Sequence, residues 1–129
     1  FVPEGYDFTK FYESIQPSDS TYLNHYKYFN NYEYNKSVLL INRTLHYDNG
    51  YLMMTENEAL VSPISVIYYQ TYKQIDAVKE QLASQVEKVQ CIVGQAIAIE
   101  NLIPFGKSQQ PELSDYADAV DTMKFLEAL

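Results

Sequence analysis

A strand, a helix and a second strand follow one another in the middle of the chain, and this order constrains the fold more than any other feature. Residues 64–69 are mostly branched or aromatic, as in a strand, and apolar side chains recur at helical spacing over 72–86. Residues 89–93 form an apolar-leaning run that stops at Gly94, which is typical of a buried strand. Parallel strands joined by a helix make a right-handed βαβ unit. The sequence therefore predicts an α/β fold with a parallel or mixed sheet.

Shorter elements are expected on both sides of this unit. Residues 36–42 and 51–54 have the composition of strands, and Asp48-Asn49-Gly50 between them predicts a β-hairpin, because Asn and Gly tolerate the positive φ of tight turns. Helices over 7–15 and 18–30 are predicted before the hairpin. After the unit we expect a strand over 97–103, a loop over 104–110 and a helix over 111–126 that Pro111 opens.

The length and composition are those of one compact domain. The chain has 129 residues, of which 47% are hydrophobic and 20% charged, and this excludes intrinsic disorder. Tyrosines crowd into the first part, so we expect an aromatic helical segment over 1–33 and the rest of the domain over 34–129. The aromatic helices are expected to have packed on a region outside this chain, in preference to stacking on a ligand. The chain opens on Phe1 without an initiator methionine, so we expect that an upstream segment was removed.

The charge balance excludes some classes of partner. With 17 acidic residues, nine basic residues and a formal charge of −8, the chain lacks the clustered cations that bind phosphate, so no nucleic-acid partner is expected. Its longest apolar-leaning stretch, 89–99, is far shorter than the roughly 20 residues that cross a bilayer, so no membrane span is expected. The single cysteine, Cys91, cannot form an intrachain disulfide, which favours a reducing compartment and hence the cytoplasm.

Cys91 and the two histidines are the first candidates for chemistry. A cysteine nucleophile needs a nearby base or positive dipole and partial exposure, whereas Cys91 lies in the middle of a predicted buried strand. We therefore expect a structural thiol. His25 and His46 lack the close His or Cys spacing of a metal site, so they are expected to be packed or surface residues and no metal is predicted.

Acidic residues are the second candidates. Glu56 and Glu58 are close enough in sequence to supply paired-carboxylate chemistry, but two solvated loop carboxylates are the commoner explanation. Three aspartates recur at intervals of three, as on the solvated face of a helix: Asp115, Asp118 and Asp121. Neither pattern by itself identifies an active site.

One segment after the hairpin goes further. Residues 52–66 read Leu-Met-Met-Thr-Glu-Asn-Glu-Ala-Leu-Val-Ser-Pro-Ile-Ser-Val and lead into a strand and then a helix that begins near Ile75. This segment resembles the aldehyde dehydrogenase superfamily, in which a Glu shortly before Gly-Pro leads into a strand and a helix. Ser62 stands where the superfamily has the glycine, and Glu58 lies five residues before Pro63, where the superfamily pattern has four.

The tail carries a second resemblance. Residues 102–123 read Leu-Ile-Pro-Phe-Gly-Lys-Ser-Gln-Gln-Pro-Glu-Leu-Ser-Asp-Tyr-Ala-Asp-Ala-Val-Asp-Thr-Met. They are similar to the carboxy-terminal end of the acyl-CoA reductases related to the bacterial luminescence fatty-acid reductase, where a Pro-apolar-Gly-polar turn precedes an acidic helix. Phe105 and Gly106 match the superfamily's Pro-Phe-Gly turn near the substrate channel. Together the two resemblances cover roughly residues 34 to 129.

These resemblances imply an NADPH-dependent reductase that converts a fatty acyl-CoA to the aldehyde through a cysteine thioester. The family's nucleotide-binding domain and its nucleophilic cysteine precede this region, so Cys91 is not the nucleophile, NADP is bound mainly upstream, and this chain alone is expected to be inactive. The superfamily glutamate, which contacts the nicotinamide ribose or helps position water, corresponds to Glu58, with Glu56 as the rival. Homo-oligomers are common in the superfamily.

Two alternatives stay open at this point. The chain could be a free-standing interaction module that docks on a partner protein through its aromatic amino-terminal helices. It could also be an independent hydrolase that uses Cys91 or the pair Glu56 and Glu58, which would require a cleft around those residues.

Overall fold

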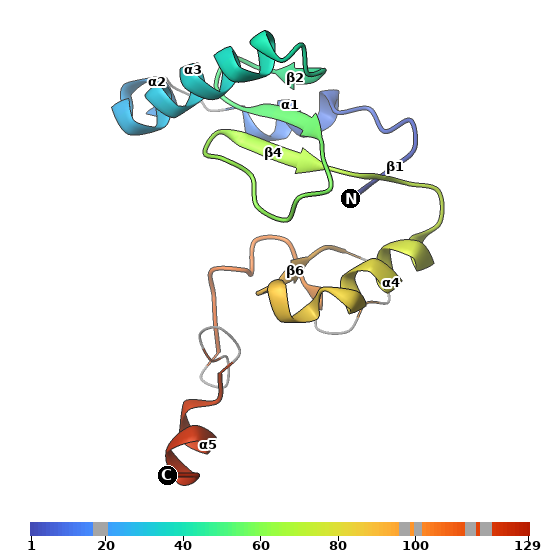
Figure 1. Cartoon of the computed structure of the whole chain (residues 1–129), viewed down its shortest axis with the longest axis vertical. Helices are drawn as coiled ribbons and strands as arrows, with labels where there is room; N and C mark the ends of the chain where they lie inside the picture. The colour runs from blue at the N-terminus through green and yellow to red at the C-terminus, as the bar shows by residue number, and fades with distance from the viewer. Residues whose placement is uncertain (17–20, 96–98, 100–101, 113–115, 117–119) are drawn as a thin grey trace. The chain divides into compact units, whose positions relative to one another are not determined.

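The computed structural model of the chain describes residues 1–16, 21–95, 99, 102–112, 116 and 120–129. They form a mixed α/β structure of short helices and small sheets (Figure 1). The chain divides into two compact units, Phe1–Gln74 and Ile75–Leu129. The predicted boundary between residues 33 and 34 therefore falls inside the first unit, within a helix.

The first unit holds most of the regular structure. Its elements are β1 (Val2–Pro3), α1 (Thr9–Ile15), α2 (Thr21–Asn24), α3 (Tyr26–Ile41), β2 (His46–Asp48), β3 (Met53–Glu56), β4 (Val66–Tyr69) and β5 (Thr71–Tyr72). Strands β2, β3 and β4 form one sheet in that order, with β2 antiparallel and β4 parallel to β3. Strand β1 pairs in parallel with β5.

Helix α3 and the sheet enclose the core of this unit. Tyr32, Met53 and Val66 are buried together, and Met53 has no exposed surface. Phe29 and Leu39 pack against them from α3. Residues 29, 32 and 39 follow helical spacing, so one face of α3 is turned to the sheet.

The predicted strand over 36–42 is wrong, because residues 36–41 complete helix α3 and Asn42 caps it. A short apolar run has no period that separates a strand from a buried helix, and here the helix already begins at Tyr26, capped by the His25 ring. Once a helix is nucleated, each added residue gains a hydrogen bond, so the run extends it. The helix ends where Arg43 adopts a positive φ of 55° and Thr44 N donates to the Leu39 carbonyl at 2.9 Å.

The hairpin turn is confirmed, but its first strand is β2 and not residues 36–42. Gly50 has a φ of 94°, as the turn requires. The Asn49 side chain accepts hydrogen bonds from the Tyr51 and Leu52 amides at 3.3 and 2.9 Å. The local turn signal was therefore correct, while the identity of the strand before it was decided by contacts with α3.

The predicted βαβ unit is also corrected. The elements of the second unit are α4 (Ile75–Ser84), a 3-10 turn (Val86–Lys88), β6 (Ile92–Val93), β7 (Leu102–Ile103) and α5 (Thr122–Glu127). Helix α4 falls within the predicted 72–86 and buries Val78 and Leu82. Strand β4 pairs with β3, whereas β6 pairs in parallel with β7, so the two strands flanking α4 belong to different sheets. A partner nearby in sequence costs less loop entropy than a distant one, which favours β7 for so short a strand.

Two further predictions in the second unit are wrong. Cys91 is exposed and precedes β6, so it is not a buried strand residue. The terminal helix begins at Thr122, and Pro111 lies outside it. The Asp121 side chain accepts a hydrogen bond from the Lys124 amide at 3.0 Å, which caps the helix at this point and gives this aspartate a structural role. Asp115 and Asp118 lie outside the described residues.

Other predicted elements fit the structure. Helix α1 lies within 7–15, preceded by an Asp7 carboxylate that accepts from the Thr9 amide at 2.9 Å. The predicted helix over 18–30 is divided at His25 into α2 and the start of α3, and residues 17–20 lie outside the described residues. Residues 102–103 form the described end of the strand predicted over 97–103, and 104–110 is a loop.

Candidate functional site

Glu58 lies on the loop that joins the parallel strands β3 and β4. The loop spans residues 57–65, and Glu58 is exposed within it. The Asn57 side chain accepts a hydrogen bond from the Ala59 amide at 2.9 Å. The Asn57 amide donates to the Tyr69 carbonyl at 3.1 Å, so the start of the loop is tied to the end of β4. A solvent-facing carboxylate on a fixed loop can accept hydrogen bonds from hydroxyl groups of a ligand.

Glu56, the rival of Glu58, has a different environment. It is the last residue of β3, and its carboxylate accepts a hydrogen bond from the Thr71 hydroxyl at 2.9 Å. The two glutamates are therefore not equivalent, because Glu56 ties β3 to β5 while Glu58 stays on the loop. This difference favours Glu58 as the residue that meets a ligand.

The far end of the loop is strained and anchored. Ser65 is buried and has a φ of 66°, a conformation that residues other than glycine rarely adopt. The Asn35 side chain, on α3, donates to the Ile64 carbonyl at 2.9 Å. Backbone strain of this kind persists only where surrounding contacts hold it, and it is frequent at ligand sites. Here the strain and the anchor lie directly before β4.

A shallow pocket of about 210 Å³ adjoins this loop. It lies beside β4 within the first unit, and its walls come from the amino terminus, the loop and the strand: Phe1, Asn57, Ala59, Leu60, Ser62, Ile67, Tyr68 and Gln70. Asn57 and Ala59, the neighbours of Glu58, line the pocket, whereas Glu58 is not among its lining residues.

Phe105 and Gly106 form a tight turn in the second unit. Gly106 has a φ of 78°, and the Lys107 amide donates to the Pro104 carbonyl at 3.1 Å. Phe105 is 68% exposed. The turn therefore requires glycine at this position and presents an aromatic side chain to its surroundings. Glu58 belongs to the first unit and this turn to the second.

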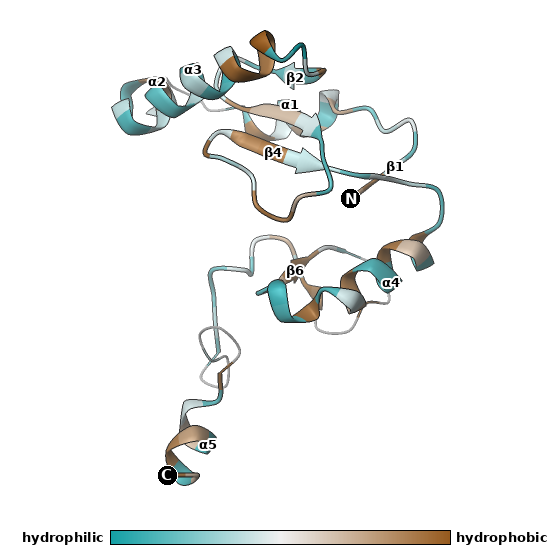
Figure 2. Cartoon of the chain, in the orientation of Figure 1, coloured by the Kyte–Doolittle hydropathy of each residue, from teal (hydrophilic) through white to brown (hydrophobic). Residues whose placement is uncertain are grey.

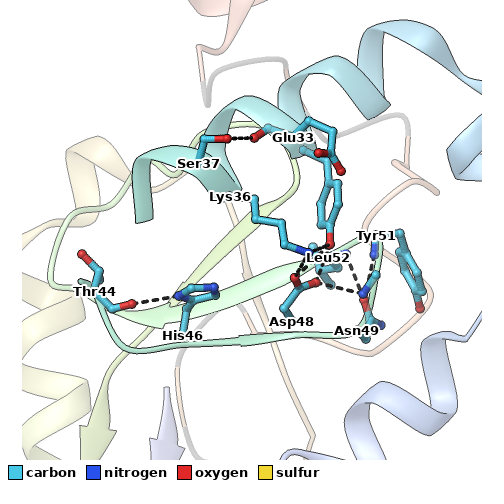
Figure 3. Close-up of polar contacts among 11 residues, drawn as sticks. Glu33, Lys36, Ser37, Thr44, His46, Asp48, Asn49, Tyr51 and Leu52 are labelled. Atoms are coloured by element: carbon cyan, nitrogen blue, oxygen red, sulfur yellow. Dashed lines mark hydrogen bonds and ion pairs between the residues drawn. The ribbon is translucent and has the colours of Figure 1, made fainter. Parts of the chain in front are cut away.

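Sequence reasoning missed a polar cluster that joins α3 to the hairpin (Figure 3). The Tyr32 hydroxyl donates to the Asp48 carboxylate, with distances of 2.7 and 2.9 Å to its two oxygens. Lys36 Nζ lies 2.8 Å from Asp48 Oδ2, donates to the Tyr32 oxygen at 3.1 Å and lies 5.2 Å from the centroid of the Tyr32 ring. The Gly50 amide completes the cluster by donating to Asp48 at 2.8 Å.

The electrostatics of this cluster indicate a structural role. Burial raises the pKa of Tyr32, and its hydrogen bond to Asp48 raises it further, although Lys36 opposes this effect. The tyrosine therefore keeps its proton and cannot act as a base at neutral pH. Burial alone would raise the pKa of Asp48, but hydrogen bonds from Lys36, Tyr32 and the Gly50 amide lower it overall. The cluster is a charged clamp between α3 and β2.

The sequence contains a pattern that indicates the clamp. Tyr32 and Lys36 are four residues apart, so they share a face of a helix, and Asp48 directly precedes the predicted turn. Assigning residues 36–42 to a strand hid this pairing, because it placed Lys36 on the wrong element.

Tyrosines of the aromatic segment 1–33 contact one another and Tyr51 of the hairpin. The rings of Tyr22 and Tyr51 stack with centroids 5.1 Å apart and planes 4° apart. The Tyr28 hydroxyl donates to the Tyr51 carbonyl at 2.8 Å, and the Tyr51 hydroxyl donates to the Ile15 carbonyl at 2.6 Å. Tyr26 of this segment is 81% exposed, and Tyr34 directly after it is 68% exposed. The aromatic segment therefore supplies internal contacts as well as accessible surface.

No three metal-ligating side chains of the described part of the chain gather into a site, and His25 instead accepts from the Tyr28 amide while His46 Nδ1 lies 2.8 Å from the Thr44 carbonyl oxygen. No helix in the described ranges has the length and apolar character needed to cross a membrane.

Comparison with known proteins gives no relative: no family model matches the sequence, no curated protein matches it, and no solved structure matches the fold.

Proposed function

We propose that this chain is the carboxy-terminal part of an NADPH-dependent acyl-CoA reductase of the aldehyde dehydrogenase type. The observation that carries the proposal is the position of Glu58. It is exposed on a loop between two parallel strands, in the segment that resembles the superfamily, and its neighbours Asn57 and Ala59 line a pocket. Its carboxylate is free of the contact that holds Glu56 to Thr71.

The proposed reaction consumes a fatty acyl-CoA, NADPH and a proton, and it yields the aldehyde, NADP⁺ and free CoA. The acyl group passes from the CoA sulfur to a cysteine thiolate, and a hydride reduces the resulting thioester. In this proposal the nucleophile and the nucleotide-binding domain lie outside the chain, so the chain alone is inactive. Exposed Cys91 precedes the short strand β6 and takes no part in the reaction.

Glu58 would contact the cofactor through its ribose. Ribose hydroxyls donate hydrogen bonds, and an ionised carboxylate accepts them strongly. The exposed position of Glu58 fits this role, because a carboxylate on a solvent-facing loop remains available to a ligand held by another domain. In the same proposal Phe105 and Gly106 form part of the wall of the acyl channel, which suits an exposed aromatic ring on a glycine turn.

The distribution of apolar side chains supports a place in a larger protein. Among the described residues, large hydrophobic side chains that remain exposed outnumber those that are buried. Exposed apolar surface on this scale is typical of surfaces that other domains or subunits cover. The proposal therefore includes an upstream catalytic region and assembly into a homo-oligomer, and the single cysteine adds a cytoplasmic location to it.

The test uses the full-length protein that contains this chain. It is incubated with NADPH and acyl-CoA substrates of several chain lengths, and nicotinamide absorbance is followed. Oxidation of NADPH that depends on acyl-CoA is expected. If the upstream cysteine is intact and no chain length supports oxidation, the assignment is wrong.

A pair of variants tests the role of Glu58. Glu58→Gln in the full-length enzyme is expected to weaken hydride transfer or use of the cofactor by at least about tenfold, near 1.4 kcal/mol. Glu56→Gln is the matched control, because Glu56 contacts Thr71 and should affect mainly stability. Unchanged kinetics in Glu58→Gln would make Glu58 an ordinary solvated carboxylate, and a loss confined to Glu56→Gln would transfer the role to Glu56.

A second candidate function is a protein-interaction module. The observation in its favour is an exposed apolar stripe on α3 made by Tyr34, Val38 and Ile41, of which Ile41 is 80% exposed. Figure 2 shows this hydrophobic character at the carboxyl end of α3. The gene distinguishes the candidates: an upstream region with a nucleotide-binding fold and a cysteine supports the reductase, whereas an initiator methionine just before Phe1 supports the module.

A further inference from the structure

Strand β1 pairs with one edge of β5, and the outer edge of β4 continues that edge. The Val2 amide donates to the Gln70 carbonyl at 3.0 Å, and the Glu4 amide donates to the Tyr72 carbonyl at 3.0 Å. These bonds form a parallel ladder between β1 and β5. Strand β5 follows β4 after a single residue, so β1 stops where the outer edge of β4 begins.

Alternation along β4 shows which backbone groups face outward. The Ser65 and Tyr69 carbonyls accept from the Met53 and Asn57 amides at 2.9 and 3.1 Å, so these odd-numbered positions face β3. Successive residues of a strand direct their backbone groups to opposite sides, so Tyr68 turns its N–H and carbonyl away from β3. Within the described ranges β4 is the last strand of its sheet.

The surroundings of this edge suit an added strand. The pocket of about 210 Å³ lies against it, between Tyr68, Phe1 and the loop residue Leu60. Phe1 and Leu60 are 47% and 45% exposed, so an incoming segment would cover apolar surface as well as pair its backbone. An open edge with apolar neighbours is a template for pairing unless something covers it.

We propose that the segment immediately ahead of Phe1 in the full-length polypeptide runs parallel to β4 and forms a strand on its outer edge. This inference rests on the proposed function, which makes the chain part of a longer protein. Continuing the ladder of β1 fixes the register. The residue directly ahead of Phe1 donates to the Tyr68 carbonyl, and the third residue ahead accepts from the Tyr68 amide. The added strand covers the pocket and supports the loop that carries Glu58.

Hydrogen exchange in the full-length protein tests this directly, read at single amides by mass spectrometry with fragmentation. The Tyr72 amide serves as an internal reference because Tyr72 is paired with β1, and the exposed loop residue Val61 serves as the unpaired reference. The Tyr68 amide is expected to exchange at least about tenfold more slowly than the Val61 amide, after correction for intrinsic rates. Exchange of Tyr68 at the corrected rate of Val61 would overturn the inference.

Two variants at Tyr68 separate the backbone from the side chain. Tyr68→Pro removes the outward-facing N–H at an edge position, where proline is tolerated in a sheet. The amide of the residue directly ahead of Phe1 should then lose its protection, while the Met53 amide should stay protected. Tyr68→Phe keeps the N–H and should preserve protection in both places. If Tyr68→Pro leaves upstream protection unchanged, the inference is wrong. If Tyr68→Pro does not fold, the exchange rate of Tyr68 in the unmodified protein still decides.

The same sample distinguishes failure of this inference from failure of the proposed function. Fast exchange at Tyr68 in a protein that reduces acyl-CoA overturns the added strand alone. Slow exchange at Tyr68 in a protein without reductase activity supports the strand and overturns the function. A full-length protein that begins at Phe1 overturns the strand.

Discussion

The two compact units bury their apolar residues in different ways. In the first unit, Tyr32, Met53 and Val66 come from three separate elements, and a charged clamp joins α3 to β2. In the second unit, the buried hydrophobic residues that the structure describes are Val78 and Leu82, both on α4. A core built from separate elements couples them, whereas burial along one helix leaves the other elements weakly coupled. We therefore expect the first unit to be the more stable.

Of the variants that test this difference, Met53→Ala has the largest expected effect. Met53 has no exposed surface, so its truncation should lower the free energy of unfolding by about 2–5 kcal/mol. Urea denaturation followed by tyrosine fluorescence measures the loss, since the chain has 13 tyrosines and no tryptophan. Met123→Ala is the matched control because Met123 is 60% exposed, and it should cost less than about 0.5 kcal/mol. Equal costs would remove the evidence for a stable core in the first unit.

Leu82→Ala is the corresponding test in the second unit. We expect a cost near the lower end of the range for buried leucine, about 2 kcal/mol, because a site with few buried neighbours relaxes easily. Hydrogen exchange should show the loss in amides of α4, with the Met54 amide of β3 unaffected. Exchange that accelerates equally in both units would show that they unfold together, contrary to the comparison.

Asp48→Asn has the smallest expected effect, and its effect on the free energy of unfolding depends on pH. Removing the charge should cost about 1–3 kcal/mol at pH 7, because Tyr32 and Lys36 lose a charged acceptor. The pKa of Asp48 is lower in the folded protein than in the unfolded chain, so its contribution is present above the unfolded pKa of about 3.9 and is lost as pH falls through the folded pKa.

Urea denaturation of both proteins at several pH values checks this dependence. The difference between the original protein and Asp48→Asn should be largest near neutral pH and should shrink below about pH 4. A difference that stays constant down to the lowest pH would mean that the clamp contributes through packing and not through the Asp48 charge.

Local signals predicted part of the fold. Asn49 and Gly50 marked the turn because their side chains or φ values satisfy it directly, and the spacing of Val78 and Leu82 marked α4. These features depend on neighbours within a few residues. The predicted strand over 36–42 failed because an apolar run suits either a strand or a buried helix, and the choice depended on contacts with β3.

The sequence did not predict which strands pair with one another. Nothing in residues 92–93 specifies Leu102 and Ile103 as partners in place of β4, because pairing depends on which strands the chain brings together. Cys91 was misplaced for the same reason, since its burial was deduced from a strand that is shorter than predicted.

The candidate site divides in the same way. The sequence identified Glu56 and Glu58 as the acidic pair, and only the structure separates them, by the hydrogen bond from Thr71 to Glu56. The clamp of Tyr32, Lys36 and Asp48 could not be predicted once Lys36 was assigned to a strand. The role of Glu58 remains a prediction that the kinetic variants test.

The most direct measurement of the reductase proposal is isotope transfer from the cofactor to the product. The full-length protein is incubated with a fatty acyl-CoA and NADPH that carries deuterium at the transferable position of nicotinamide C4, and the products are analysed by mass spectrometry. We predict a fatty aldehyde with deuterium at its carbonyl carbon, together with an equal amount of free CoA. Free CoA without aldehyde, or aldehyde without deuterium, would contradict the proposal.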